Sequence, residues 1–221
     1  MLYSLTAVRD NIRNREGKRV FYLGKGDQLT SEARDFLTRE RIEILPADQA
    51  KPLRWKLETG GYMEEKPEHM THLNGDTLVP KTHPRIAFRG AIDTLEAEIM
   101  LCQLKLPHLE EPLGEILQLA RNILRCEVLD EPIKERSLCG LSEDEQRRRS
   151  HFPQDYYGQP HFMPQVTDGE TILRLNKLRT VVRAAERKAV AAVSDRTDIL
   201  QAMNRMSSMV YLLMIQEKAS K

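Results

Sequence analysis

Two arginines and a glutamate lie close together on a segment that the sequence predicts to be one long helix. Arg179, Arg183 and Glu186 are separated by four and by three residues, so at about 100° per residue they fall on one side of a helix over 173–193. This polar stripe borders the apolar face of the segment, where a second helix or a ligand could cover it. Charge pairs along a solvated helix face would give the same spacing. The position beside the apolar face makes the three residues candidates for a functional site.

The helix that carries this stripe has an apolar face and recognisable ends. Turn residues precede it at Asp168-Gly169 and follow it at Ser194-Asp195. Its apolar residues recur at steps of three and four: Leu175, Leu178, Val182, Ala185, Ala189 and Val193. Helical patterns also cover 84–106, about 112–129, a short segment that opens with a capping box at 142–145, and about 196–218. The chain is therefore predicted to be mainly α-helical, with a bundle of about five helices.

The composition is that of a soluble globular protein. The 221 residues are 40% hydrophobic and 30% charged, and they suffice for one full domain and a small one. A net charge of +1 argues against a nucleic-acid-binding protein. No apolar run is long enough to span a bilayer, and the N-terminus lacks a signal pattern, so we expect a cytoplasmic protein with no membrane partner. The three cysteines are expected to be reduced thiols.

The sequence divides into three regions. Residues 1–50 predict a small strand-helix-strand unit of the α/β type, with strands near 19–23 and 42–45 and a helix capped by Thr30. Residues 51–80 are rich in proline and glycine and show no lasting periodicity, so we expect a linker or an irregular loop. The helical bundle is expected over 81–221.

Several spaced motifs resemble those of the ATP:cob(I)alamin adenosyltransferases of the propanediol-utilisation type. Residues 179–187 match the pattern R-x-x-x-R-x-A-E-R, and N-R-M-S at 204–207 resembles the N-R-L-S of that family's last helix. Residues 79–85 resemble its V-x-K-x-x-P-R, and 90–95 its G-x-x-D-E-L. The resemblance covers about 70–216. It implies a helical bundle of the cobalamin adenosyltransferase type, assembled as a homotrimer with active sites between subunits.

Within that family, the short sequence motifs of this chain are most similar to those of the ethanolamine-utilisation branch. The strings at 130–132, 140–145, 178–180 and 198–205 carry this similarity. Two departures stand out. The histidine followed by C-C-x-x-C, which binds a metal in some members of the branch, has no counterpart, so no cysteine-based metal site is expected. The nucleotide-gripping T-G-D-x-G-x-T loop of the propanediol branch is also missing.

The resemblance implies an alkyl transfer in which Co(I) of a corrinoid attacks the ribose 5′ carbon of ATP and triphosphate leaves. The protein then supplies orientation and charge stabilisation, which for a polyanion means guanidinium groups, a lysine and Mg²⁺. The resemblance implies that ATP is bound, and the leaving group stabilised, by the residues at the matching positions: Arg179, Arg183 and Lys81. Glu186 holds an arginine in place or faces the nucleotide, and Asn204 donates or accepts a hydrogen bond to ATP.

Two further residues take roles from the same resemblance. Asp93 is expected to pair with Arg179 or Arg183 and to orient it, although an exposed aspartate near a helix start is an equal alternative. Phe162 lies where the propanediol branch carries a phenylalanine that removes the lower axial ligand of cobalamin. The alternative for Phe162 is a loop aromatic that packs onto the bundle.

The resemblance thus implies an ATP:cob(I)alamin adenosyltransferase that makes adenosylcobalamin for ethanolamine ammonia-lyase. That enzyme and a reductase are the implied protein partners, and the implied location is the cytoplasm or a bacterial microcompartment. The alternative is a non-catalytic protein that binds a corrinoid or ATP for delivery, or that docks to a microcompartment shell.

Overall fold

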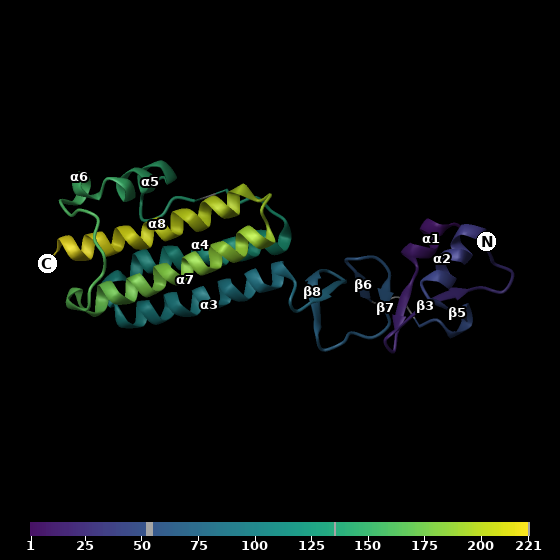
Figure 1. The fold of residues 1–221 in the computed structure, drawn as a ribbon. Coiled ribbons are helices and arrows are strands. Elements are labelled where there is room, and N and C mark those ends of the chain that lie inside the picture. Colours follow the sequence, from purple (N-terminus) through teal and green to yellow (C-terminus); the bar gives the residue numbers. More distant parts are fainter. Residues whose placement is uncertain (52–54, 135, 221) are drawn as a thin grey trace. The chain divides into compact units, whose positions relative to one another are not determined.

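The computed structural model describes residues 1–51, 55–134 and 136–220. The chain forms two compact units, Met1–His83 and Pro84–Lys221 (Figure 1). The boundary after His83 lies close to the predicted start of the bundle at residue 81. No helix within these described ranges combines the length and apolar character needed to cross a membrane.

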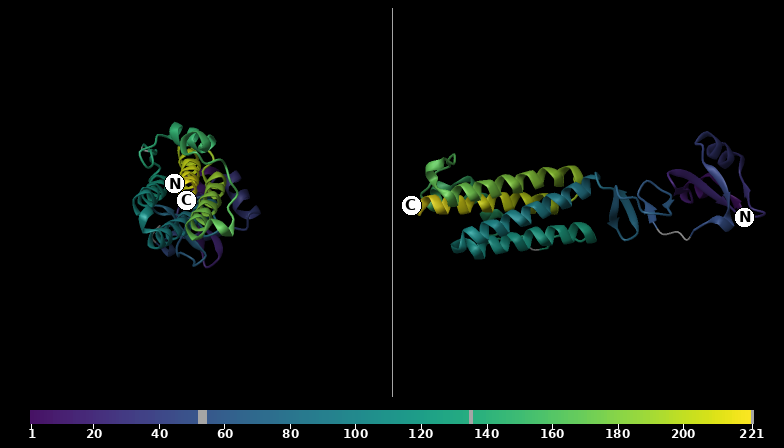
Figure 2. Two further views of the ribbon diagram at one scale, coloured as in Figure 1. Left: turned by 90° about the vertical axis from the view of Figure 1, so that its left-hand side faces the viewer. Right: turned by 90° about the horizontal axis from the view of Figure 1, so that it is seen from below.

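The second unit is a bundle of long helices, as predicted. Its helices are α3 (Pro84–Lys105), α4 (Glu110–Leu129), α5 (Glu143–His151), α6 (Pro153–Tyr157), α7 (Glu170–Ala192) and α8 (Thr197–Ala219). Helix α7 packs against both α3 and α8, and α3 also packs against α4. The short helices α5 and α6 pack against α8, and Figure 1 shows both of them above it. The views of Figure 2 show the same long helices end-on and from below.

The buried face of α7 is the one that the sequence predicted. Leu175, Leu178, Val182 and Ala189 are each 0% exposed, and they join the single core of this unit. Helix α8 is buried on more than one side, because α5 and α6 cover part of the surface that α7 leaves open. Packing of these two helices therefore fixes which α7 and α8 side chains meet at the edge of the core.

Hydrogen bonds order the long connection between α4 and α7. Ser142 caps α5 by accepting from the Glu145 amide at 3.3 Å, and the Glu145 carboxylate accepts from the Ser142 amide at 3.0 Å. This is the predicted capping box. Upstream, the Asp198 carboxylate of α8 accepts from the Ile133 amide at 3.0 Å. The connection is thus attached to α8 before α5 begins.

A buried carboxylate joins the start of α3 to the end of α4. Glu127 is 0% exposed and accepts hydrogen bonds from Arg85 and from Nε of Arg89, the latter at 2.7 Å. Arg85 also donates to the main-chain oxygen of Glu127 at 2.7 Å. Because an unpaired buried charge is costly, the three groups depend on one another.

The first unit contains a seven-stranded sheet of order β5-β3-β2-β7-β6-β9-β8 and a separate pair β1-β4. The elements of residues 1–50 are β1 (Leu2–Tyr3), α1 (Leu5–Asp10), β2 (Arg13–Arg15), β3 (Lys18–Leu23), β4 (Gln28–Leu29), α2 (Ser31–Arg39) and β5 (Glu43–Pro46). Strands β3 and β5 are paired in parallel, and α2 lies between them in the sequence. Thr30 caps α2 by accepting a hydrogen bond from the Ala33 amide. The predicted strand-helix-strand unit is present, and its small core includes Phe21 and Leu37.

The prediction of a linker over 51–80 is not what the structure shows. The described part of this segment contributes β6 (Trp55–Leu57), β7 (Tyr62–Met63), β8 (Met70–Asn74) and β9 (Thr77–Pro80), which extend the sheet. These strands are too short to produce a lasting alternation of apolar and polar residues. The glycines that suggested a linker form turns instead: Gly60 and Gly61, at φ 93° and 81°, connect β6 to β7.

We expect Glu127→Ala to lower the free energy of unfolding by about 3 kcal/mol, because it leaves two arginines without their shared buried carboxylate. Denaturant unfolding of the full chain would measure this change. Glu131→Ala is the matched control, since Glu131 forms an exposed ion pair with Arg125 at 2.8 Å and its loss is expected to cost less than about 1 kcal/mol. Equal effects of the two substitutions would contradict a stabilising role for the buried cluster.

Candidate active site

Four of the residues singled out in the sequence line one pocket between α7 and α8. Arg179, Arg183 and Glu186 come from α7 and Asn204 from α8, and the pocket has a volume of about 250 Å³. The remaining lining residues are Ser150 of α5 and Ser207, Ser208 and Tyr211 of α8. Every one of these side chains is polar or charged. The pocket is therefore suited to a polar or anionic ligand.

The two arginines of the pocket are not neutralised by the nearby glutamate. Among the ion pairs of the residues that the structure describes, none joins Glu186 to Arg179 or Arg183. Instead, Glu186 accepts a hydrogen bond from the side-chain amide of Asn204 at 3.2 Å. The amide oxygen of Asn204 accepts in turn from Arg205 at 2.7 Å. Simple charge pairing along the helix, the alternative left open by the sequence, is not the arrangement observed.

The surroundings of the Arg179 guanidinium disfavour its positive charge. Its Nε is buried and has no hydrogen-bond partner within the described structure. Partial burial lowers the pKa of Arg179, and repulsion from Arg183 lowers it further. Its guanidinium lies 5.7 Å from the centre of the Tyr211 ring, a contact that favours the cation. An anionic group in this pocket would supply both the missing acceptor and the missing counter-charge.

Four lining residues were not predicted from the sequence. Ser207 belongs to the N-R-M-S motif, and Tyr211 lies one helical turn beyond it, so the helical period could have found both. Ser208 donates to the main-chain oxygen of Asn204 at 3.2 Å. Ser150 reaches the pocket from α5, and no sequence spacing relates α5 to α7 or α8.

The predicted pairing of Asp93 with an arginine of α7 does not occur within the chain. Asp93 is exposed on α3, and no ion pair of the described residues joins it to Arg179 or Arg183. The reason is geometric: α3 meets α7 through its buried face, which includes Ile92 and Leu95, and Asp93 is turned away from that face.

Lys81 lies outside the unit that holds the pocket, and Phe162 is not among the residues that line the pocket. Lys81 is an exposed residue of the first unit, with its Nζ 4.0 Å from a carboxylate oxygen of Glu68. Phe162 is partly buried against the core of the bundle, and the ammonium of Lys218 lies 5.7 Å from its ring centre. Their proposed roles toward ATP and the corrinoid remain predictions.

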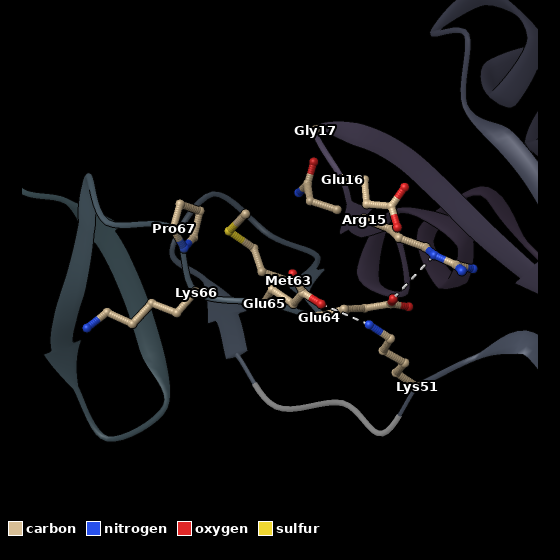
Figure 3. Close-up of a pocket in the computed structure, with 10 residues that line it drawn as sticks. Arg15, Glu16, Gly17, Lys51, Met63, Glu64, Glu65, Lys66 and Pro67 are labelled. Carbon is tan, nitrogen blue, oxygen red and sulfur yellow. Dashed lines mark hydrogen bonds and ion pairs between the residues drawn. The ribbon is translucent and has the colours of Figure 1, made fainter.

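A separate cavity of about 210 Å³ lies in the first unit, beside β2 and β7 (Figure 3). Several of its charged groups are paired with neighbouring side chains. Lys51 bonds to Glu65 at 2.9 Å, the Tyr22 hydroxyl donates to the buried Glu64 at 2.6 Å, and Arg15 lies 3.9 Å from the same carboxylate. One carboxylate oxygen of the buried Glu64 has no hydrogen-bond partner among the described residues, so this cavity offers an acceptor where an anion would need a donor. It is therefore a weaker candidate for an anionic ligand than the pocket of α7 and α8. In the part of the chain described, no group of three or more His, Cys, Asp or Glu could hold a metal ion.

Comparisons with known proteins agree with the motifs. The family model described as "Cobalamin adenosyltransferase" matches residues 61–217. The corrinoid adenosyltransferase EutT of Salmonella typhimurium is 33% identical over 95% of this chain and 90% of its own length. The EutT of Escherichia coli K12 is 37% identical over 68% of this chain and 59% of its own length.

Solved structures share the fold of the helical unit. A PduO-type ATP:corrinoid adenosyltransferase variant from Lactobacillus reuteri, complexed with cobalamin and ATP, superposes with a TM-score of 0.51 at 21% identity, covering 67% of this chain and 88% of that one. Another variant from the same organism, complexed with ATP, gives 0.50 at 21% identity over 66% and 87%. The family match over most of the chain confirms the resemblance of the motifs, and the chain therefore belongs to the cobalamin adenosyltransferase family as a EutT-like member.

Proposed function

We propose that this protein is an ATP:cob(I)alamin adenosyltransferase that provides adenosylcobalamin for ethanolamine ammonia-lyase. The observation that carries the proposal is the pair of arginines in the polar pocket, one of them with a buried Nε for which the described residues offer no acceptor. A triphosphate is the part of ATP that would satisfy such a pair, because guanidinium groups bind phosphate oxygens through charge-assisted hydrogen bonds. EutT relatives named as corrinoid adenosyltransferases support the assignment.

In the proposed reaction a Co–C bond forms at the ribose 5′ carbon, the C–O bond to triphosphate breaks, and the electron pair of Co(I) becomes the new bond. Negative charge on the departing triphosphate grows as that bond breaks. Arg179 and Arg183 stabilise this charge, and the contribution of Arg179 is strengthened because its guanidinium is partly desolvated. Asn204 is held by Glu186 and Arg205, so it presents a preorganised hydrogen-bonding group to the nucleotide.

Mg²⁺ fits this proposal as a companion of the phosphates. The ion commonly keeps several waters and is held by one or two carboxylates together with substrate phosphates. Glu186 is the carboxylate that lines the pocket, and it accepts only the Asn204 bond among the interactions described. Glu186 is therefore the residue that we propose to hold Mg²⁺, directly or through water.

We further propose that the active protein is a homotrimer in which Asp93 of one copy pairs with an arginine of another. Asp93 shares an exposed face of α3 with apolar side chains: Met100, Leu101 and Leu104 are 46%, 55% and 73% exposed. Exposed apolar side chains on one helix face favour a protein contact. Such a contact would also give Asp93 a cationic partner, for which the described residues of one chain show no ion pair. A reductase partner, binding of ethanolamine ammonia-lyase and location in the cytoplasm or a microcompartment remain expectations from the family.

The first test is anaerobic adenosylation of prereduced cob(I)alamin with ATP and Mg²⁺. We expect turnover by the wild type and a loss of about 10²-fold or more in kcat/KM for Arg183→Ala, because a stabilising charge at the leaving group is removed. Arg187→Ala is the matched control, since Arg187 is an exposed arginine on the same helix that does not line the pocket. Binding of ATP or corrinoid without turnover by the wild type would favour the delivery or scaffold alternative.

The role of Phe162 is tested by comparing two forms of the substrate. We expect Phe162→Ala to lower adenosylation from cob(II)alamin with a reductant by at least about tenfold, while largely sparing prereduced cob(I)alamin, because only the first route needs the axial ligand removed. Phe152→Ala, a change at a 57% exposed phenylalanine of the same connection, is the control. Equal losses on both routes would leave Phe162 a packing residue.

The inter-subunit pairing of Asp93 is tested by complementation. Asp93→Ala and Arg183→Ala chains are each expected to be inactive, but co-expression should restore roughly a quarter of the sites, because some sites then draw both intact residues from different copies. Sedimentation measures the assembly state, and adenosylation measures the recovery. Absence of any recovery in mixed trimers would show that the two residues do not meet across a subunit boundary.

A further inference from the structure

Tyr211 is in contact with both the candidate pocket and the segment that carries Phe162. Its ring lies under the guanidinium of Arg179, at 5.7 Å from the ring centre. Its hydroxyl lies 2.8 Å from Nδ1 of His161, the residue before Phe162. The two rings are also stacked, with centroids 5.8 Å apart and planes inclined by 11°. One side chain of α8 thus reaches an arginine of α7 and the connection between α6 and α7.

The hydrogen bonds of His161 fix the direction of this contact. Its Nε2 lies 3.1 Å from the main-chain oxygen of His151, and because a carbonyl only accepts, Nε2 carries the proton. In the neutral ring Nδ1 is then an acceptor, so the Tyr211 hydroxyl donates to it. Burial raises the pKa of Tyr211, and a backbone hydrogen bond with Phe162 opposes that shift. The hydroxyl is therefore engaged by two consecutive residues.

This contact matters because residues 159–164 are held through side chains, of which Phe162 packs against the bundle core. They form no helix or strand, and the structure gives them no backbone-to-backbone hydrogen bond within the described residues. A phenylalanine would fill the same position on the apolar band of α8 equally well. Packing against the apolar band does not require the Tyr211 hydroxyl, so the hydroxyl needs another explanation.

We propose that Tyr211 and His161 are positioning residues: the Tyr211 ring holds Arg179 in the pocket, and its hydroxyl, through His161, holds the 159–164 segment that presents Phe162. The inference rests on the proposed function, since it assigns the two sides of Tyr211 to the nucleotide and to the corrinoid. No group in the reaction is transferred through either residue. Their effect is to fix the position of Arg179 on α7 relative to the 159–164 segment.

The test compares His161→Ala, His161→Asn and Tyr211→Leu in the full-length protein. We expect His161→Ala to raise hydrogen exchange of the Phe162 amide, which is hydrogen-bonded to the Tyr211 hydroxyl, by about tenfold. The KM for cobalamin should rise severalfold, with the Kd for ATP within about twofold of wild type. His161→Asn, whose side-chain oxygen can accept from the Tyr211 hydroxyl, should recover most of the protection. Tyr211→Leu should loosen the segment and also weaken ATP binding, measured by calorimetry, because Arg179 loses the ring.

Met163→Ala is the control, since Met163 belongs to the same segment and is 81% exposed. Unchanged exchange in His161→Ala would overturn the proposal, and so would equal changes in the ATP Kd and the cobalamin KM, which indicate a general structural effect. Exchange and ATP binding need no turnover. If the wild type binds ATP but forms no adenosylcobalamin while His161→Ala still loosens 159–164, the proposed reaction fails and the positioning role stands.

Discussion

The antiparallel contact between α7 and α8 is the constraint on which the candidate site depends. Leu175, Leu178, Val182 and Ala189 must be buried, and this requirement fixes the rotation of α7 about its axis. Arg179 is then held at the edge of the core, where it is partly desolvated, and the described residues show no ion pair between it and Glu186, which bonds to Asn204 instead. The hydrophobic burial of one face thereby maintains, on its border, a guanidinium whose buried Nε has no hydrogen-bond partner among the described residues. A ligand anion is the simplest group that would relieve this cost.

Arg179 and Arg183 differ in environment, and this difference suggests different roles toward the phosphates. Arg179 is confined by the Tyr211 ring below it and by burial of its Nε, so it offers a fixed donor. Arg183 is exposed and can change rotamer at little cost. A fixed group is suited to orienting a bound phosphate, because little order is lost on binding. A mobile group is suited to following the charge as the triphosphate departs.

Patterns along a single helix were predictable, and relations between separate segments were not. The period of α7 gave the stripe of Arg179, Arg183 and Glu186, and motif similarity added Asn204 on α8. Ser150 could not be found, because its approach depends on how α5 lies along α8. Asp93 follows the buried Ile92 by one residue and is exposed on α3, so its predicted pairing with an arginine would need a second copy of the chain and stays a prediction. The segment 51–80 was missed because its strands of two to five residues are shorter than any reliable alternation.

The connection between α4 and α7 shows how an irregular segment can become part of a site. Its beginning is attached to α8 through Asp198 and the Ile133 amide, its middle by the Ser142 capping box, and its end by the buried Asp168, which pairs with Lys218. These attachments leave 159–164 as the part that relies on side chains. Tyr211 meets that part next to Phe162, and the same ring meets Arg179. A polar residue on an otherwise apolar band of α8 therefore has a structural explanation: its apolar ring and its hydroxyl face two different elements, and both elements carry candidate substrate contacts.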